Sequence, residues 1–283
     1  MNTSKGKQEP DHLLILVHGI MASPKDWTYG EAVLKRRLGG NFYIYASSAN
    51  IYTKTFVGID MAGRRLADEL PFLQGLSILE KLAAPLAPLI VGRTGAQLFL
   101  TDGDPSKPPL LLQMASDCED KMFILALAAF KNRVLYANVS YDHMVGWRTS
   151  SVRREKDLIK PSHRSLEGYK HIVNVEYCSP VSSQAPHFPS KAARAKEAAQ
   201  RTPNAENTEE YHQMMEEEMI NGLQKVGWRK VDVNFHSSFW PYSAHNSIHV
   251  KNEWLHNAGA GVIAHVADSI KQQESRPCLS ANL

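Results

Sequence analysis

The first seventy residues alternate between short apolar runs and amphipathic segments. Residues 13–17 (LLILV) form a wholly apolar run rich in branched side chains, which predicts a strand buried on both faces of a parallel sheet. Residues 24–38 carry apolar side chains at helical spacing, and a second strand is predicted at 42–46 (FYIYA). A second helix is predicted at 58–70. Two strands that are each followed by a helix indicate an α/β sheet.

This pattern breaks directly after residue 70. Pro71 follows the second predicted helix, and residues 72–100 are apolar and interrupted by proline and glycine, without the third strand that the pattern leads one to expect. Two interpretations of the apolar segment stay open, a lid or lipid-facing cap and ordinary core packing. A helix at 117–130 and a strand at 133–139 (RVLYANV) are predicted next.

The C-terminal part of the chain predicts three further elements. A helix rich in acidic residues is expected from 208 to about 226, and residues 230–236 (KVDVNFH) alternate between apolar and polar positions. Such alternation is typical of a strand with one solvent-exposed face, so we expect this strand near the edge of the sheet. A last helix is predicted at about 251–273.

Length and composition favour one folded domain. The chain has 283 residues, of which 43% are hydrophobic, enough for a substantial core. We expect a single domain at residues 13–273, between a disordered tail at 1–12 and a C-terminal tail at 274–283. Residues 179–207, rich in Ser, Pro, Ala and charge, predict a mobile insertion.

Charge and cysteine content exclude several classes of protein. The net charge of +3 gives no argument for nucleic-acid binding, and basic clusters at 35–37 and 153–156 predict solvated faces, with weak attraction to anionic lipid headgroups as a hypothesis. Three cysteines argue against a disulfide framework. Neither a signal peptide nor a membrane-spanning run is visible, so we expect a cytoplasmic protein. No cofactor or metal is expected, because dinucleotide-binding, Walker and zinc motifs are absent from the sequence.

Polar residues follow three of the predicted strands. His18-Gly19-Ile20 follows the first strand, Asp142 follows the strand at 133–139, and His245 follows the last strand. Active sites of open α/β sheets lie at the carboxyl ends of the strands, and an acid followed by a histidine matches the Ser…Asp…His order of α/β-hydrolases. His249, four residues further on, is the alternative histidine.

Four segments resemble the family of lipase-like putative serine esterases: LVHGIMASPKDW, NFYIYASSANIYTKTFVGIDMAGRRLADEL, RVLYANVSYDHMVGWRTSSVRRE and YSAHNSIHVKNEW. The resemblance implies an α/β-hydrolase fold, a mostly parallel sheet flanked by helices, and hydrolysis of an acyl ester, with lipid as the expected substrate. It implies that the backbone N–H of Ile20 contributes to an oxyanion hole, that Asp142 orients the imidazole, and that His245 is the general base.

The nucleophile that this resemblance calls for is missing. No two of the 17 glycines are four positions apart, so the chain contains no G-x-S-x-G elbow, and the nearest spacing, Gly92 and Gly95, flanks Thr94. The resemblance implies that a central strand–helix–strand unit is absent after residue 70. We therefore expect a hydrolase that is inactive or impaired, and a fold less stable than that of a full-length relative. The alternatives are a non-catalytic pseudo-hydrolase that binds lipid or a partner, and an unstable truncated isoform.

Overall fold

The computed structural model describes residues 10–73, 92–103, 107–118, 121–166, 168–181 and 205–275. Most of the apolar segment at 72–100, most of the insertion expected at 179–207, and nearly all of both expected tails lie outside the described residues. The predictions for these segments are therefore untested.

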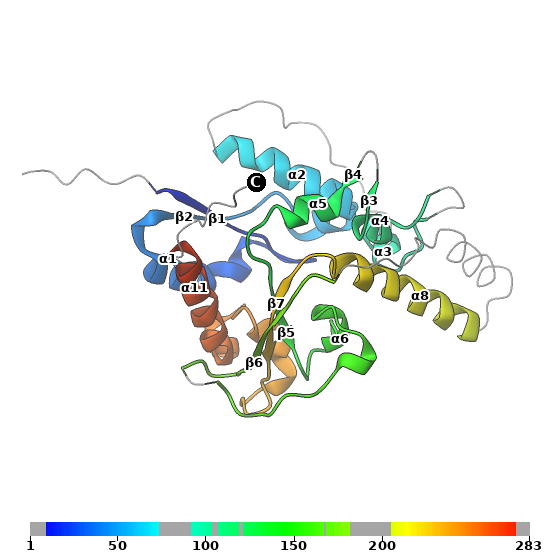
Figure 1. Cartoon of the computed structure of the whole chain (residues 1–283). Coiled ribbons are helices and arrows are strands. Elements are labelled where there is room, and N and C mark those ends of the chain that lie inside the picture. Colours follow the sequence, from blue (N-terminus) through cyan, green and yellow to red (C-terminus); the bar gives the residue numbers. More distant parts are fainter. Residues whose placement is uncertain are drawn as a thin grey trace, which may run out of the picture.

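The N-terminal part is a parallel strand–helix–strand unit (Figure 1). Strands β1 (His12–Leu16) and β2 (Phe42–Ala46) pair in parallel, with His12 opposite Phe42. Helix α1 (Thr28–Leu38) connects them after a short 3-10 turn at Pro24–Trp27. Both strand predictions are confirmed to within one residue. The apolar run at 13–17 is only partly buried, because Leu13 in β1 and Val17 directly after β1 are each 46% exposed.

Helix α2 (Ile59–Leu73) extends past the point at which it was predicted to end. The predicted end of this helix at residue 70 is therefore wrong by three residues, and Pro71 lies in the last turn. Two short helices follow, α3 (Gly92–Leu98) and α4 (Leu110–Met114). The side chain of Thr94 in α3 accepts a hydrogen bond from the Gly58 amide at 2.9 Å, which joins α3 to the start of α2.

The helix predicted at 117–130 is largely replaced by other structure. Strands β3 (Asp117–Cys118) and β4 (Lys121–Met122) form a small antiparallel ladder, and only α5 (Phe123–Ala128) is helical. The Asp117 carboxylate accepts hydrogen bonds from the backbone amides of Ile124 and Leu125, at 2.8 and 3.2 Å. These amides belong to the first turn of α5, so Asp117 acts as a cap from the preceding strand and fixes where the helix begins.

The second sheet contains three strands in the order β5-β7-β6. Strand β5 (Val134–Asn138) is parallel to β7 (Trp228–Val233), and β6 (Ile172–Cys178) is antiparallel to β7. The expectation that the last strand lies near the edge is wrong, because β7 is the middle strand. Its polar side chains are buried and satisfied from other segments, as shown by Lys230, which donates to the Val152 carbonyl at 2.9 Å. Strand β6 was not predicted.

Further helices cover this sheet and connect it to the first one. Helix α8 (Ala205–Leu223) begins three residues before its predicted start at 208. The last predicted helix is divided into α10 (Glu253–His256), a 3-10 turn at Asn257–Gly259, and α11 (Ala260–Glu274). The remaining short elements are α6 (Trp147–Ser150), α9 (Ala244–Ser247), and 3-10 turns at Gly39–Asn41, Tyr52–Phe56, Glu155–Asp157 and Pro241–Ser243.

Helix α11 packs against both sheets. Val262 belongs to the core cluster of Val231 and Val233 in β7, whereas Ala267 belongs to the cluster of Leu16 in β1. Figure 1 shows α11 beside α1, with the β5-β7-β6 sheet next to it.

The architecture is therefore mixed α/β with small sheets, and a single mostly parallel sheet is not found among the described strands. Among the described strands, β1 pairs only with β2 and β5 pairs only with β7. Strands β1 and β5 therefore each keep one edge without a partner strand. None of the described helices is long and apolar enough to cross a membrane.

Candidate active site

Asp142 and His245 lie together at the carboxyl ends of the neighbouring parallel strands β5 and β7. His245 Nδ1 is 3.2 Å from each of the two carboxylate oxygens of Asp142. The Asp142 side chain is 8% exposed and the His245 side chain is 44% exposed. A buried acid is thus paired with an imidazole that solvent can reach.

Three N–H donors hold the Asp142 carboxylate in place. Asn138, the last residue of β5, donates from Nδ2 to Oδ2 at 2.8 Å, and the amides of Met144 and Val145 donate to Oδ1 at 3.0 and 2.9 Å. Burial raises the pKa of Asp142, but these hydrogen bonds and the neighbouring His245 outweigh it and bring the pKa below its ordinary value. The acid is therefore ionised and fixed in orientation near neutral pH.

The chain turns sharply before this acid. Tyr141 has a φ of 66°, a left-handed conformation that is uncommon for a residue with a side chain. Its hydroxyl is hydrogen-bonded to His236 Nδ1 at 2.7 Å, a contact that ties the loop after β5 to the loop after β7. The turn that presents Asp142 is held by packing on the loop that leads to His245.

The hydrogen bond at Nδ1 determines what His245 can do. An ionised carboxylate accepts hydrogen bonds only, so Nδ1 carries the proton of the neutral ring and Nε2 carries the lone pair. Among the described residues Nε2 has no hydrogen-bond partner. His245 is thus arranged as a base that points its free nitrogen away from its acid.

His249, the alternative histidine, does not contact this acid. Its ring lies 5.6 Å from that of Trp27, between centroids, and burial lowers its pKa to about 4. The sequence left the choice between the two histidines open, and the geometry pairs His245 with Asp142.

Ile20 lies on the loop after β1. Its side chain is 51% exposed. The loop is fixed by the Met21 amide, which donates to Thr55 Oγ1 at 3.1 Å, and by the Ala22 amide, which donates to the Gly19 carbonyl at 3.3 Å. No hydrogen bond between described residues links the loop to Asp142 or His245.

The hydroxyl groups near other strand ends are engaged elsewhere. Ser47 and Ser48, after β2, both donate to the carboxylate of Glu69, Ser48 at 3.1 Å. Thr94, which lies between Gly92 and Gly95, is 4% exposed and donates to the Thr55 carbonyl at 2.6 Å. No serine or threonine in the described part of the chain is hydrogen-bonded to His245.

Exposed aromatic rings lie on the loop that leads to His245, a feature that the sequence analysis missed although the run FWPYSAH displays it. Tyr242 is 70% exposed, its ring is stacked on His143 with centroids 6.0 Å apart, and it meets Tyr141 edge-on at 5.4 Å. Phe239 and Trp240, on the same loop, are 88% and 60% exposed. The rim of the pair is therefore aromatic and uncharged.

The basic cluster at 153–156 is not the solvated face that the sequence predicted. Arg153 is 5% exposed and forms a two-pronged ion pair with Asp232 of β7, at 2.7 and 3.0 Å. Arg154 donates to Glu217 of α8 at 2.8 Å. Two of these cations are therefore already partnered within the chain and are not available to lipid headgroups.

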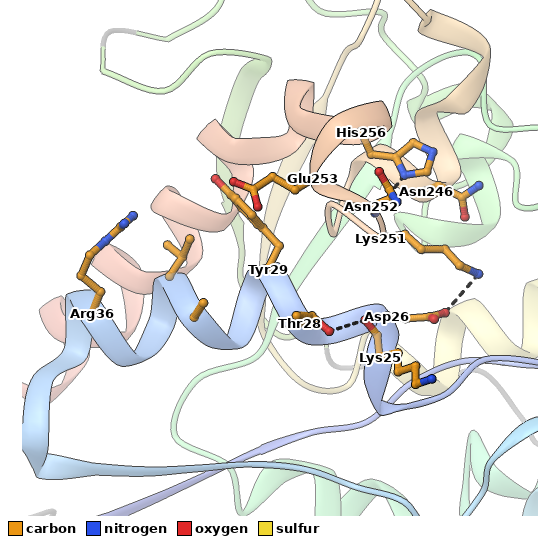
Figure 2. Close-up of a pocket in the computed structure, with 12 residues that line it drawn as sticks. Lys25, Asp26, Thr28, Tyr29, Arg36, Asn246, Lys251, Asn252, Glu253 and His256 are labelled. Atoms are coloured by element: carbon orange, nitrogen blue, oxygen red, sulfur yellow. Dashed lines mark hydrogen bonds and ion pairs between the residues drawn. The ribbon is translucent and has the colours of Figure 1, made fainter.

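A cavity of about 740 Å³ lies beside the pair, between α1 and α10 (Figure 2). Asn246, next to His245 in the sequence, contributes to its lining, but neither member of the pair does. In Figure 2 Lys251 points to Asp26, and the two form an ion pair at 3.1 Å. The cavity is therefore separate from the pair, and both polar and apolar side chains line it. The described residues contain no group of three or more His, Cys, Asp or Glu that could hold a metal ion.

Comparison with known families gives one result. The model of the family described as "Putative serine esterase (DUF676)" matches residues 7–71 and 68–152. A search of curated proteins and a search of solved structures gave no match.

Proposed function

The chain belongs to this serine esterase family, and from that premise we propose that it is the frame of an acyl-ester hydrolase that keeps the acid–base pair and lacks the nucleophile. The observation that carries the proposal is the contact of His245 Nδ1 with both carboxylate oxygens of Asp142, at 3.2 Å, at the ends of adjacent parallel strands. A histidine oriented by a buried acid is what a serine hydrolase uses to accept the hydroxyl proton and return it to the leaving group.

In this proposal each retained group has one role. Asp142 fixes the tautomer of His245 and stabilises the imidazolium, and His245 acts as general base and then as general acid. The backbone N–H of Ile20 would stabilise negative charge on the carbonyl oxygen of the substrate. For the Ile20 N–H to act in this way, the loop after β1 has to lie close to Asp142 and His245. We expect a strand inserted beside β1 to make this arrangement possible.

Two observations support the loss of the nucleophile segment. The family model matches in two segments, 7–71 and 68–152, which meet where the alternation of strands and helices breaks. In the described structure β1 and β5 each keep an edge without a partner strand. Serine-type hydrolysis is therefore expected to be impaired in this chain.

The test is labelling with a fluorophosphonate, a reagent for activated serines, read by intact mass. We expect no adduct on this chain. A version that carries the strand–elbow–helix–strand segment of a full-length family member, inserted between Leu70 and Pro71, should be labelled on one serine. A stoichiometric adduct on the present chain would refute the loss of the nucleophile.

Variants of the restored version test the acid–base assignment. His245→Ala and Asp142→Asn should slow labelling by about 10²–10⁴-fold, the range that general acid–base groups supply. His249→Gln is the matched control, because His249 has no contact with Asp142, and it should label normally. Slow labelling of His249→Gln together with normal labelling of His245→Ala would transfer the role to His249.

The substrate we propose is a lipid ester met at a lipid surface. Phe239, Trp240 and Tyr242 protrude beside the pair, and no charged residue occurs between 233 and 250. Rings of Trp and Tyr, apolar with one polar atom, suit the boundary between lipid and water. Trp240→Ser combined with Phe239→Ser should reduce sedimentation with phosphatidylcholine vesicles, whereas Trp254→Ser, also at an exposed residue, should not. Equal binding by all three proteins would contradict this surface.

A non-catalytic or unstable product is the second candidate, favoured by the exposed side chains around β1. A strand edge without a partner leaves backbone donors and acceptors unpaired, at roughly 1–3 kcal/mol for each buried group. We expect the restored version to melt at a higher temperature than the present chain, as followed by circular dichroism. Equal melting temperatures would show that the remaining strands compensate fully for the loss.

A further inference from the structure

The Asp142–His245 pair is complete as a proton acceptor even though no hydroxyl among the described residues is bonded to it. Asp142 is held by three N–H donors and is 8% exposed, while His245 is 44% exposed. Nε2, the nitrogen with the lone pair, has no partner in the described structure. In solution, water has access to this position.

We propose that the pair activates water directly, so that the chain hydrolyses acyl esters with good leaving groups without forming an acyl-serine. The inference rests on the proposed function in one respect, the assignment of the base to His245. The inference goes beyond the proposed function because it assigns an activity to the chain without a restored nucleophile segment.

The reaction is balanced with water as the only co-reactant. A water molecule hydrogen-bonded to His245 Nε2 gives its proton to that nitrogen as its oxygen forms a bond to the carbonyl carbon. The tetrahedral intermediate then expels the alcohol or phenol oxygen, which takes the proton from the imidazolium as the carbon–oxygen bond breaks. The products are one carboxylic acid and one alcohol or phenol, and His245 returns to its neutral form.

The surroundings of the pair favour aryl esters. Tyr242 and His143 are stacked at 6.0 Å between ring centroids, and Tyr141 lies edge-on to Tyr242 at 5.4 Å. Exposed rings of this kind stack on an aromatic leaving group, which brings the ester carbonyl close to His245. Because no described hydrogen bond fixes the loop with Ile20 relative to the pair, we expect the Ile20 N–H to stabilise the developing oxyanion poorly. Losing a donor costs about 10²–10³-fold in rate, so only activated esters are expected to react.

The experiment measures release of p-nitrophenolate from p-nitrophenyl acetate by the purified full chain. We expect steady turnover without a burst, and a rate at least about tenfold above that of His245→Ala, a modest share of what a positioned base supplies. Asp142→Asn should reduce the rate because the ring is no longer fixed in one tautomer. His249→Gln, the matched control, should leave it unchanged.

Two additions separate the possible outcomes. Prior treatment with a fluorophosphonate should leave the rate unchanged, and inhibition by that reagent would mean that a serine is responsible, which overturns both this inference and the loss of the nucleophile. Free imidazole should raise the rate of His245→Ala above the rate at which the same imidazole hydrolyses the ester without protein, which shows that the variant is folded and lacks only the base.

Three results would overturn the inference and leave the proposed function standing. The first is a rate in His245→Ala equal to that of the unaltered chain. The second is a rate in Asp142→Asn equal to that of the unaltered chain. The third is a burst of one equivalent with an acetyl group trapped on His245, because the imidazole would then be the nucleophile and not a base for water.

Discussion

Removing the Asp232 side chain should be among the most destabilising single changes in this protein. Asp232, in the middle strand β7, is 1% exposed. Its carboxylate accepts two hydrogen bonds from Arg153, at 2.7 and 3.0 Å, one from Trp147 Nε1 at 2.9 Å and one from Asn174 Nδ2 at 3.0 Å. The network ties α6 and the segment after it to β6 and β7.

The magnitude follows from what Asp232→Ala leaves behind. Arg153, whose side chain is 6% exposed, would keep as its ion-pair partner Glu176, whose side chain is 42% exposed. Breaking a buried ion pair by removing one partner costs about 3–5 kcal/mol, because the remaining charge stays buried without compensation. The double variant Arg153→Met/Asp232→Leu removes both charges, and its cost should be less than half of that for Asp232→Ala.

Urea unfolding followed by circular dichroism measures these differences. The control is Asp268→Ala, which removes the partner of Arg37 from an ion pair whose side chains are 37% and 39% exposed. Surface pairs contribute about 0–1 kcal/mol, so the control should be nearly neutral. A cost below about 1 kcal/mol for Asp232→Ala, or a double variant no more stable than the single one, would refute this reasoning.

Three further changes have expected outcomes of their own. Burial lowers the pKa of His249 to about 4, so on acidification the imidazole is protonated in the unfolded chain before it is protonated in the folded one. The free energy of unfolding should therefore fall by roughly 3 kcal/mol between about pH 6.5 and pH 4. Urea unfolding of His249→Asn should show a flatter dependence of stability on pH, and an unchanged dependence would contradict this role of His249. Ile172→Ala, at a fully buried residue of β6, should cost about 2–5 kcal/mol in the same assay, whereas Ile159→Ala, at a residue 84% exposed, should be close to neutral. Gly259→Ala should destabilise the protein strongly, because the new Cβ would lie 1.6 Å from a carbonyl oxygen of α9. Gly63→Ala in α2 meets open space and should stabilise the protein by about 0.5–1 kcal/mol. Equal shifts of the melting temperature for the two variants would count against this packing.

Elements with a local hydrophobic period were predicted well from the sequence. Strands β1, β2 and β5 and the start of α2 depend on side-chain spacing within a few residues, and the structure places them within a residue or two of the prediction. The edge position predicted for β7 was wrong for a physical reason. Its alternating polar residues, Lys230 and Asp232, point into the protein and are satisfied by Val152 and Arg153. No local pattern reveals a partner that lies about eighty residues away.

The same limit applies to the candidate site. The sequence favoured His245 as the base and kept His249 as the alternative. In the structure the His249 ring lies against Trp27, and His245 contacts Asp142. The run FWPYSAH shows three of the aromatic residues, but not that they lie near Tyr141 and Asp142. Only the fold brings Tyr141 and Tyr242 into contact.

Helix α11 gives this protein an unusual order of assembly during its synthesis. The core beneath β1 and α1 is completed by Ala267 of α11, and Arg37 of α1 pairs with Asp268, 231 residues further along the chain. At about 5–20 residues per second, a ribosome needs roughly 10–50 s to make that stretch. Throughout this interval the apolar faces of β1 and α1 have no partner from α11. The N-terminal unit therefore stays incomplete for longer than a domain built from neighbouring segments would, and its first strands are the part most exposed to mispairing before the last helix arrives.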